Sequence, residues 1–180
     1  MARQYFQDGP YIDPPVASGS ALVSTSAEAL WIGLTSTPIY ANDPKAGKIY
    51  SIKAGGIMST GASGTLILNP QYGVLGGTTM GVSQTVTVPI NMTNVSWFLQ
   101  MEVVFRVIGA AGANSTCMAH GYFITAPFTS APAAGISCVI PFGGTSAAVD
   151  ATISSGITIS KTLSVAGSMT TSWAFIHSRN

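Results

Sequence analysis

The chain contains few side chains that could carry out acid–base or nucleophilic chemistry. Nucleophilic hydrolysis needs a serine or cysteine, a histidine and an acid that orients the histidine. His120 and His177 are the only histidines. His120 alternates with Met118, Tyr122 and Ile124, which favours a packed, hydrogen-bonded histidine over a catalytic one. His177 lies near the end of the sequence, where we expect it to be exposed. The sequence context of neither histidine indicates a catalytic base.

The acidic residues do not form a recognisable catalytic pair. Cleavage of a glycoside needs two carboxyl groups about 5 to 10 Å apart, held by the fold. Two of the acids lie in the N-terminal stretch, one in a turn and one on a strand, while the last pair could meet only if the fold brings them together. In that order they are Asp8, Asp13, Asp43, Glu102, Glu28 and Asp150. We therefore expect no catalytic residues and no enzyme.

Metal, cofactor and phosphate sites are also not indicated. No spacing of His, Cys and Asp resembles a ligand set, so we expect no metal and no cofactor. The segment 43–48, DPKAGK, looks like a phosphate-binding loop but lacks the leading glycine and a following helix, and it is expected to be a turn. Cys117 and Cys138 are too few for a disulfide framework and are expected to be small buried side chains.

The chain carries little charge for its length. Charged residues make up 7% of the 180 residues, against about 25% in a typical domain. The formal net charge is +1, and the seven lysines and arginines are spread along the chain, so we expect no nucleic-acid partner and no genome-wrapping role. A surface with so few charges resists self-association poorly. The composition therefore favours a subunit that shares its surface with partners.

Membrane insertion and export are not indicated either. Gly, Ser, Thr, Asn and Pro interrupt every apolar run before it reaches 18 residues, so we expect no spanning helix and no membrane partner. The opening segment MARQYFQDGPYIDPP has no apolar signal core, so we expect synthesis in the cytoplasm without export.

One long stretch organises the predicted fold. In residues 95–108 every odd position from Trp97 to Val107 is large and apolar, while the even positions mix polar and apolar types. Because side chains alternate between the two faces of a strand, this predicts a long strand with one wholly buried face and one half-exposed face. Such a strand needs a second layer of apolar side chains opposite it.

Further strands separated by turn residues are predicted along the rest of the chain. They lie at 21–32, 48–54, 57–60, 65–68, 82–90, 116–125, 136–141, 151–165 and 169–177. We expect a kink or bulge at Gly55–Gly56, a hairpin joining 57–60 to 65–68, and a break at Ser155–Gly156. The pattern indicates an all-β, antiparallel two-sheet β-sandwich over residues 18–180, most typical of a jelly roll.

Residues 1–17 form a separate stretch ahead of this domain. Three prolines, at positions 10, 14 and 15, disfavour both a helix and a core strand, so we expect an extended arm. Four large side chains in it exceed what a solvated tail needs. We predict that the arm contacts a partner through Tyr5, Phe6, Tyr11 and Ile12.

The order of these motifs resembles the small jelly-roll virion proteins of tailed bacteriophages, capsid decoration (cement) proteins among them. The similarity covers about residues 45–177, but not the arm or the loop 126–150. It is carried by AGKIYSIKAGGIMST (46–60), TLIL (65–68), TNVSWFLQMEV (93–103), RVIG (106–109), GYF (121–123) and 160–176 with Trp173. The resemblance implies a homo-oligomer, commonly a trimer, that decorates the capsid exterior or serves as a head or tail appendage.

Two functions follow as expectations. The first is a capsid decoration protein that trimerises on the outer shell and bridges copies of the major capsid protein. The second is a head-fibre or tail-tip module that recognises a host receptor or glycan. In the second case Tyr72, Phe128 or Phe142 could stack on sugar, although rings that merely pin loops are the favoured interpretation of these three.

Overall fold

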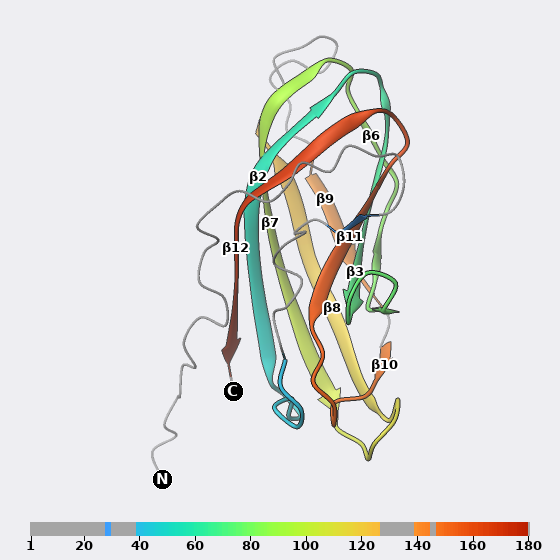
Figure 1. Cartoon of the computed structure of the whole chain (residues 1–180), viewed down its shortest axis with the longest axis vertical. Coiled ribbons are helices and arrows are strands. Elements are labelled where there is room, and N and C mark those ends of the chain that lie inside the picture. The colour runs from blue at the N-terminus through green and yellow to red at the C-terminus, as the bar shows by residue number, and fades with distance from the viewer. Residues whose placement is uncertain (1–27, 30–38, 127–138, 145–146, 180) are drawn as a thin grey trace.

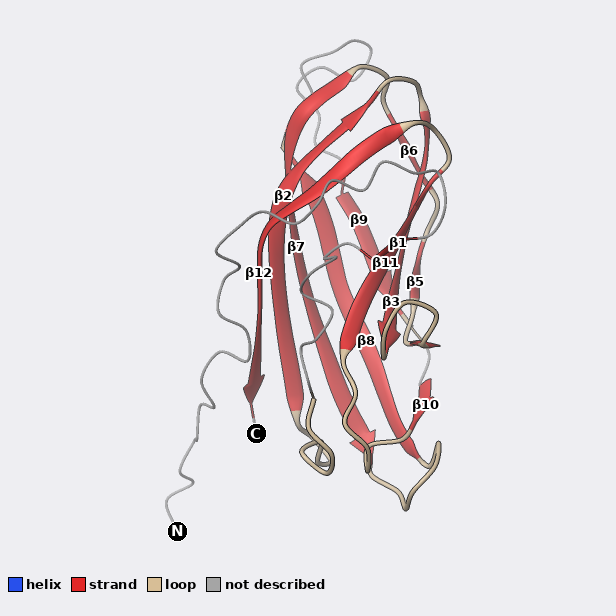
Figure 2. Cartoon of the chain, in the orientation of Figure 1, coloured by secondary structure: helices blue, strands red, loops and turns tan. Residues whose placement is uncertain are grey.

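The computed structural model describes residues 28–29, 39–126, 139–144 and 147–179 (Figure 1). Every regular element within these residues is a β-strand (Figure 2). The strands are β1 (Glu28–Ala29), β2 (Ile49–Thr60), β3 (Gly64–Tyr72), β4 (Thr78–Thr79), β5 (Val82–Ser83), β6 (Val86–Val88), β7 (Met92–Val107), β8 (Ser115–Thr125), β9 (Val139–Gly143), β10 (Ala147–Val149), β11 (Ile157–Leu163) and β12 (Gly167–Arg179).

These strands form two antiparallel sheets that pack as a sandwich. The seven-stranded sheet has the order β12-β2-β7-β8-β9-β5, with β10 paired to β8. The five-stranded sheet has the order β1-β11-β3-β4, with β6 paired to β3. One apolar core lies between them, and it includes Tyr50, Leu68, Phe105, Phe123 and Ile159. The predicted all-β sandwich is confirmed. Its jelly-roll form stays a prediction, and the arm 1–17 lies outside the described residues.

The long strand predicted around residues 95–108 is β7, and its buried face is nearly as expected. Trp97, Leu99, Met101, Val103 and Phe105 are all buried. Val107, expected on the same face, is 52% exposed. The pairing with β8 shifts register between Phe105 and Val107, so one extra residue of β7 reverses the alternation there.

The glycine pair in β2 lies beside a bulge that belongs to the neighbouring strand. Gly55 and Gly56 keep regular register with β7, and the bulge predicted here lies instead on β12, between Thr171 and Trp173. A Cβ on Gly56 would lie 1.8 Å from the carbonyl oxygen of Thr170. The second glycine is thus required because the bulged neighbour's backbone approaches closely.

Three of the predicted strand assignments are wrong in their sheet or their length. Residues 57–60 belong to β2 and 65–68 to β3, which lie in different sheets, so the turn at 61–63 crosses between layers and does not close a hairpin. The strand expected at 82–90 divides into β5 and β6, also in different sheets. In the segment 151–165 the break at Ser155–Gly156 is confirmed, but only the part after it forms a long strand. Short apolar alternation does not specify which sheet a segment joins.

Candidate functional site

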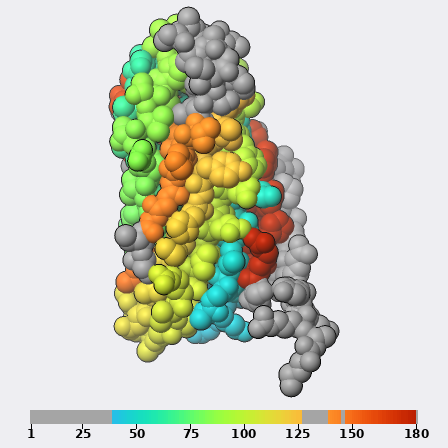
Figure 3. Space-filling model, turned by 180° about the vertical axis from the view of Figure 1, so that it is seen from behind, coloured from blue at the N-terminus to red at the C-terminus, as the bar shows by residue number. Residues whose placement is uncertain are grey.

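Several large side chains that could contact a ligand lie on the outer face of the seven-stranded sheet. Figure 3 views this face, with β9, β8, β7, β2 and β12 side by side across it. The strand register aligns its residues in rows across the sheet. One row is Trp173, Gly55, Phe98, Ile124 and Val139; the next is Phe175, Lys53, Gln100, Tyr122 and Pro141; the third is His177, Ser51, Glu102, His120 and Gly143.

Five rings on this face form a continuous series, which we call the ring cluster: Tyr122, Phe98, Trp173, Phe175 and His177. The ring centroids of successive members are 6.4, 6.0, 5.6 and 4.8 Å apart. Trp173 and Phe175 are nearly parallel, at 21°. Such spacings are typical of favourable aromatic contacts. The cluster therefore joins three strands, β8, β7 and β12, into one ordered aromatic surface.

Trp173 can lie across the sheet because β2 has no side chain at the neighbouring position. A Cβ on Gly55 would lie 2.7 Å from three atoms of the Trp173 indole. The indole therefore occupies the space above Gly55 and reaches Phe98 on the strand beyond. One face of the ring covers the strand, its other face points away from the sheet, and the residue is partly exposed.

A hollow of about 390 Å³ lies next to the rings. It is lined by Ser51, Lys53, Gln100, Glu102, His177 and Arg179. The volume is within the range of small-ligand sites. Arg179 donates to the carboxylate of Glu102, and the Tyr122 hydroxyl donates to Gln100 Oε1 at 3.4 Å. The lining thus supplies hydrogen-bond donors and acceptors beside an aromatic surface.

A second surface lies at one end of the sandwich, where the segments 39–48, 105–114 and 150–156 come together (Figure 1). We call it the loop end. Tyr40, Val107, Ile108 and Ile153 are exposed there, between 38% and 58% each. Backbone hydrogen bonds join the segments: Asn42 to Ala151 at 2.9 Å and Gly47 to Phe105 at 2.8 Å. Backbone hydrogen bonds therefore join the segments that carry the exposed apolar side chains.

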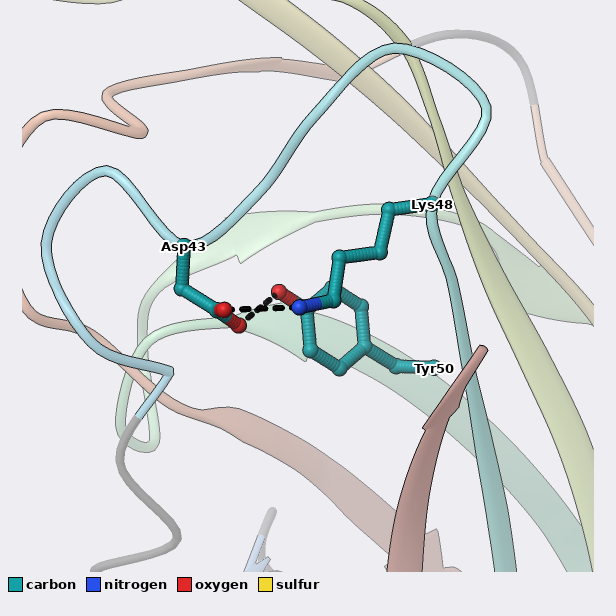
Figure 4. A network of polar contacts seen from close by, with 3 residues as sticks. All are labelled: Asp43, Lys48 and Tyr50. Carbon is teal, nitrogen blue, oxygen red and sulfur yellow. Dashed lines mark hydrogen bonds and ion pairs between the residues drawn. The ribbon is translucent and has the colours of Figure 1, made fainter. Parts of the chain in front are cut away.

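Lys48 and Asp43 of the loop end form an ion pair next to Tyr50 (Figure 4). Lys48 Nζ donates to Asp43 Oδ1 at 2.6 Å, and the Tyr50 hydroxyl donates to Asp43 Oδ2 at 2.6 Å. Lys48 is almost fully buried. The phosphate-loop-like segment 43–48 is confirmed as a turn, and its lysine contributes to this internal network.

Asp150 orders the neighbouring loop. Its carboxylate accepts hydrogen bonds from the Gly112 amide at 2.7 Å and from the amide and hydroxyl of Thr152 at 2.9 and 2.6 Å. These bonds, the Thr152 hydroxyl first, hold the pKa of the Asp150 carboxyl below its ordinary value. This carboxylate therefore holds a turn.

Of the residues proposed from the sequence for partner or sugar contact, only Tyr72 and Phe142 lie within the described residues. Tyr5, Phe6, Tyr11 and Ile12 lie outside the described residues, as does Phe128. Tyr72 and Phe142 are buried in the core. Their burial leaves neither ring exposed for stacking on sugar, and the interpretation that they pin loops stays a prediction. Cys117 is buried as expected, its thiol is free, and Cys138 lies outside the described residues.

The environments of the two histidines differ from the predictions, which were a packed His120 and an exposed His177. His120 shares a face with Met118, Tyr122 and Ile124 as predicted, but this is the outer face of β8, and His120 is exposed. His177 lies within β12 and packs edge-on against Phe175.

Among the described residues, no three of His, Cys, Asp and Glu are grouped as metal ligands. No helix that could cross a membrane is found in this part of the chain.

Comparisons with known proteins assign no family. No family model matches the chain, and no curated protein matches it. Among solved structures, the chain is similar to one described as the CBM2 module of the evolved Dit of Lactobacillus casei BL23 phage J-1. The similarity covers 79% of this chain and 67% of that one, at 8% identity and a TM-score of 0.23. At that TM-score it carries no argument about fold or function.

The ring cluster was not anticipated from the sequence. The alternation of Trp173, Phe175 and His177 on one side of a strand was a usable signal. Phe98 and Tyr122 are 75 and 51 residues away from Trp173 in the numbering, and only the register of three strand pairs brings all five rings together.

Proposed function

We propose that this chain is a non-enzymatic structural protein of a tailed-bacteriophage virion, a decoration protein that trimerises on the capsid exterior. The sandwich fold and the similarity of motif order to small jelly-roll virion proteins both support this proposal. The observation that carries it is the loop end, where four large apolar side chains are exposed on hydrogen-bonded loops. Exposed apolar patches of this kind mark contact surfaces.

Burial of the loop end supplies the attachment free energy in this proposal. Each Å² of apolar surface removed from water contributes about 25 cal/mol before association costs are subtracted. A trimer presents three such surfaces at once, and avidity then multiplies weak single contacts. With few charges on the chain, attachment depends mainly on this burial and only weakly on salt.

The test is the mass of the purified protein, alone and with empty capsids of the phage that encodes it. We expect three times the 18.4 kDa of one chain by light scattering, and co-sedimentation with the capsids. Val107→Ser with Ile153→Ser should weaken co-sedimentation at least about tenfold, because each replaces exposed apolar surface. Val74→Ser, at an exposed valine outside the loop end, is the matched control. Capsid binding that is absent, or that the paired change leaves intact, would reject the proposal.

The ring cluster favours a second candidate, a head-fibre or tail-tip module that recognises a host glycan. Aromatic rings beside hydrogen-bonding groups are the usual composition of a site for a polar small ligand. The copy number in purified particles separates the two candidates. Many copies on the shell support decoration, whereas a few copies at one vertex or on the tail support the binding module.

A further inference from the structure

We infer that the ring cluster and the adjoining hollow form a binding site for an oligosaccharide. A sugar ring stacks on the outward side of Trp173, and the neighbouring sugar hydroxyl groups bond to the polar side chains of the hollow. The inference rests on the binding-module form of the proposed function, and its test uses the isolated protein without capsids.

The aromatic part of the site matches the apolar face of a sugar ring. An aromatic ring is negative on its face, and the C–H groups of a pyranose present a weakly positive, apolar surface to it. Trp173 lies over Gly55, where no side chain obstructs it, and its ring contacts to Phe98 and Phe175 hold it in place. The stacking surface is therefore ordered before any ligand binds, which reduces the entropy lost on binding.

The polar part of the site matches sugar hydroxyl groups, each of which is both donor and acceptor. Ser51, Lys53 and Gln100 supply a hydroxyl, an ammonium and an amide within one hollow. Positions 173 and 177 are four residues apart on β12, about 13 Å at the usual rise of a strand. The site is thus elongated along the strand, which suits a chain of sugars better than a single one.

The charges in the hollow argue against a protein or nucleic acid as the occupant. The centres of protein interfaces are depleted of charged residues, yet Lys53, Glu102 and Arg179 all line this hollow. Single-stranded nucleic acid also stacks on rings, but it needs a uniformly positive groove, and the acidic Glu102 lines this hollow. Glu102 pairs with Arg179, and no ion pair is recorded for Lys53 among the described residues. Lys53 therefore adds attraction for an acidic sugar.

The experiment measures binding of four probes to the full chain by isothermal titration calorimetry: cellohexaose, maltohexaose, chitohexaose and a galacturonic acid hexamer. We expect at least one probe to bind with a Kd below about 1 mM. Trp173→Ala should weaken that binding at least about tenfold, because the stacking surface is lost. Tyr40→Ala, at an exposed tyrosine of the loop end, is the matched control and should change the Kd less than about twofold.

Two further variants keep the test decisive if Trp173→Ala does not fold. Tyr122→Ala removes another ring of the cluster, and Gln100→Ala removes an amide that lines the hollow. Each should weaken binding severalfold. Lys53→Ala should weaken the acidic probe more than the neutral ones. Absence of binding by all four probes overturns the inference, as does a folded Trp173→Ala protein that binds like the wild type. If Trp173→Ala lowers the oligomeric mass, the rings pack between copies, and the inference is also overturned. Loss of capsid attachment with sugar binding intact would reject only the decoration proposal.

Discussion

The outer faces of the two sheets differ sharply although the sheets share one core. On the seven-stranded sheet the outward positions carry the ring cluster and the charged hollow. On β3 and β11 of the five-stranded sheet the outward positions carry no aromatic and no charged residue. They are Thr65, Ile67, Asn69, Gln71, Thr158, Ser160 and Thr162.

Two polar side chains of the five-stranded sheet bond to nearby backbone groups. Ser160 donates to the Asn69 carbonyl at 3.4 Å, and Gln71 accepts from the Gly76 amide at 3.0 Å. Thr158 and Ser160 are buried although they point away from the core. The outer face of the seven-stranded sheet, in contrast, presents rings and long polar side chains. Among the described residues of these strands, the aromatic and charged outward side chains therefore lie on the seven-stranded sheet.

The largest effect is expected where the backbones of the seven-stranded sheet meet most closely. Gly56→Ala places a Cβ 1.8 Å from the Thr170 carbonyl oxygen, so β2 and β12 must separate. We expect a loss of about 3 kcal/mol or more in the free energy of unfolding, measured with urea. Gly61→Ala is the control, because a Cβ there meets nothing within 4 Å. Equal stability of the two variants would contradict this account of the glycine.

A second prediction compares one side chain from each outer face. Trp173→Ala removes ring contacts to Phe98 and Phe175 and should cost about 2 kcal/mol in the free energy of unfolding. Ile67→Ala on the five-stranded sheet should cost less than about 1 kcal/mol, because it has no such ring contacts. Urea midpoints at constant m-value give both numbers. A larger cost for Ile67→Ala would reverse the comparison.

The shared core should weaken in alkali. Burial raises the pKa of the Cys117 thiol from 9.0 to about 12, and burial likewise raises the pKa of the Tyr72 hydroxyl from 10.0 to about 12. Raised pKa values mean that the unfolded chain loses these protons first, so stability is full below pH 9 and falls as the pH rises toward 12. We expect a loss on the order of 1 kcal/mol by pH 10, mainly from Cys117. Cys117→Ala should flatten this pH dependence, and an unchanged slope would exclude the thiol as its source.

The smallest effect concerns acid at the loop end. The pKa of Asp150 is lowered, so its contribution to stability is present above the ordinary value of 3.8 and is lost as the pH falls through the lower, folded-state value. Asp150→Asn should remove that part of the acid dependence and leave the alkaline part unchanged. Unfolding followed by fluorescence between pH 5 and pH 2 would test it. An identical acid profile for the variant would show that the carboxylate's charge contributes nothing there.

The sequence alone determined the fold class and the buried face of the central strand. Alternation over a long run is a strong signal, because one slipped residue would expose the whole apolar face of β7. The same alternation places Trp173 and Phe175 on one side of β12 and Ala174 and Ile176 on the other. The turn at 43–48 followed from its own residue types.

Only the tertiary structure decided which sheet each short strand joins and which side chains meet on the outer face. The apolar alternation of a strand is the same in either sheet. The sequence around 61–63 therefore does not show that the chain crosses between sheets there, and the sequence of 82–90 does not show that this segment divides between them. Lys161, fully buried opposite Leu68, shows that alternation can also carry a charged residue to the core face. The ring cluster depends on the register of β12, β2, β7 and β8, a relation between distant segments that no single stretch of sequence contains.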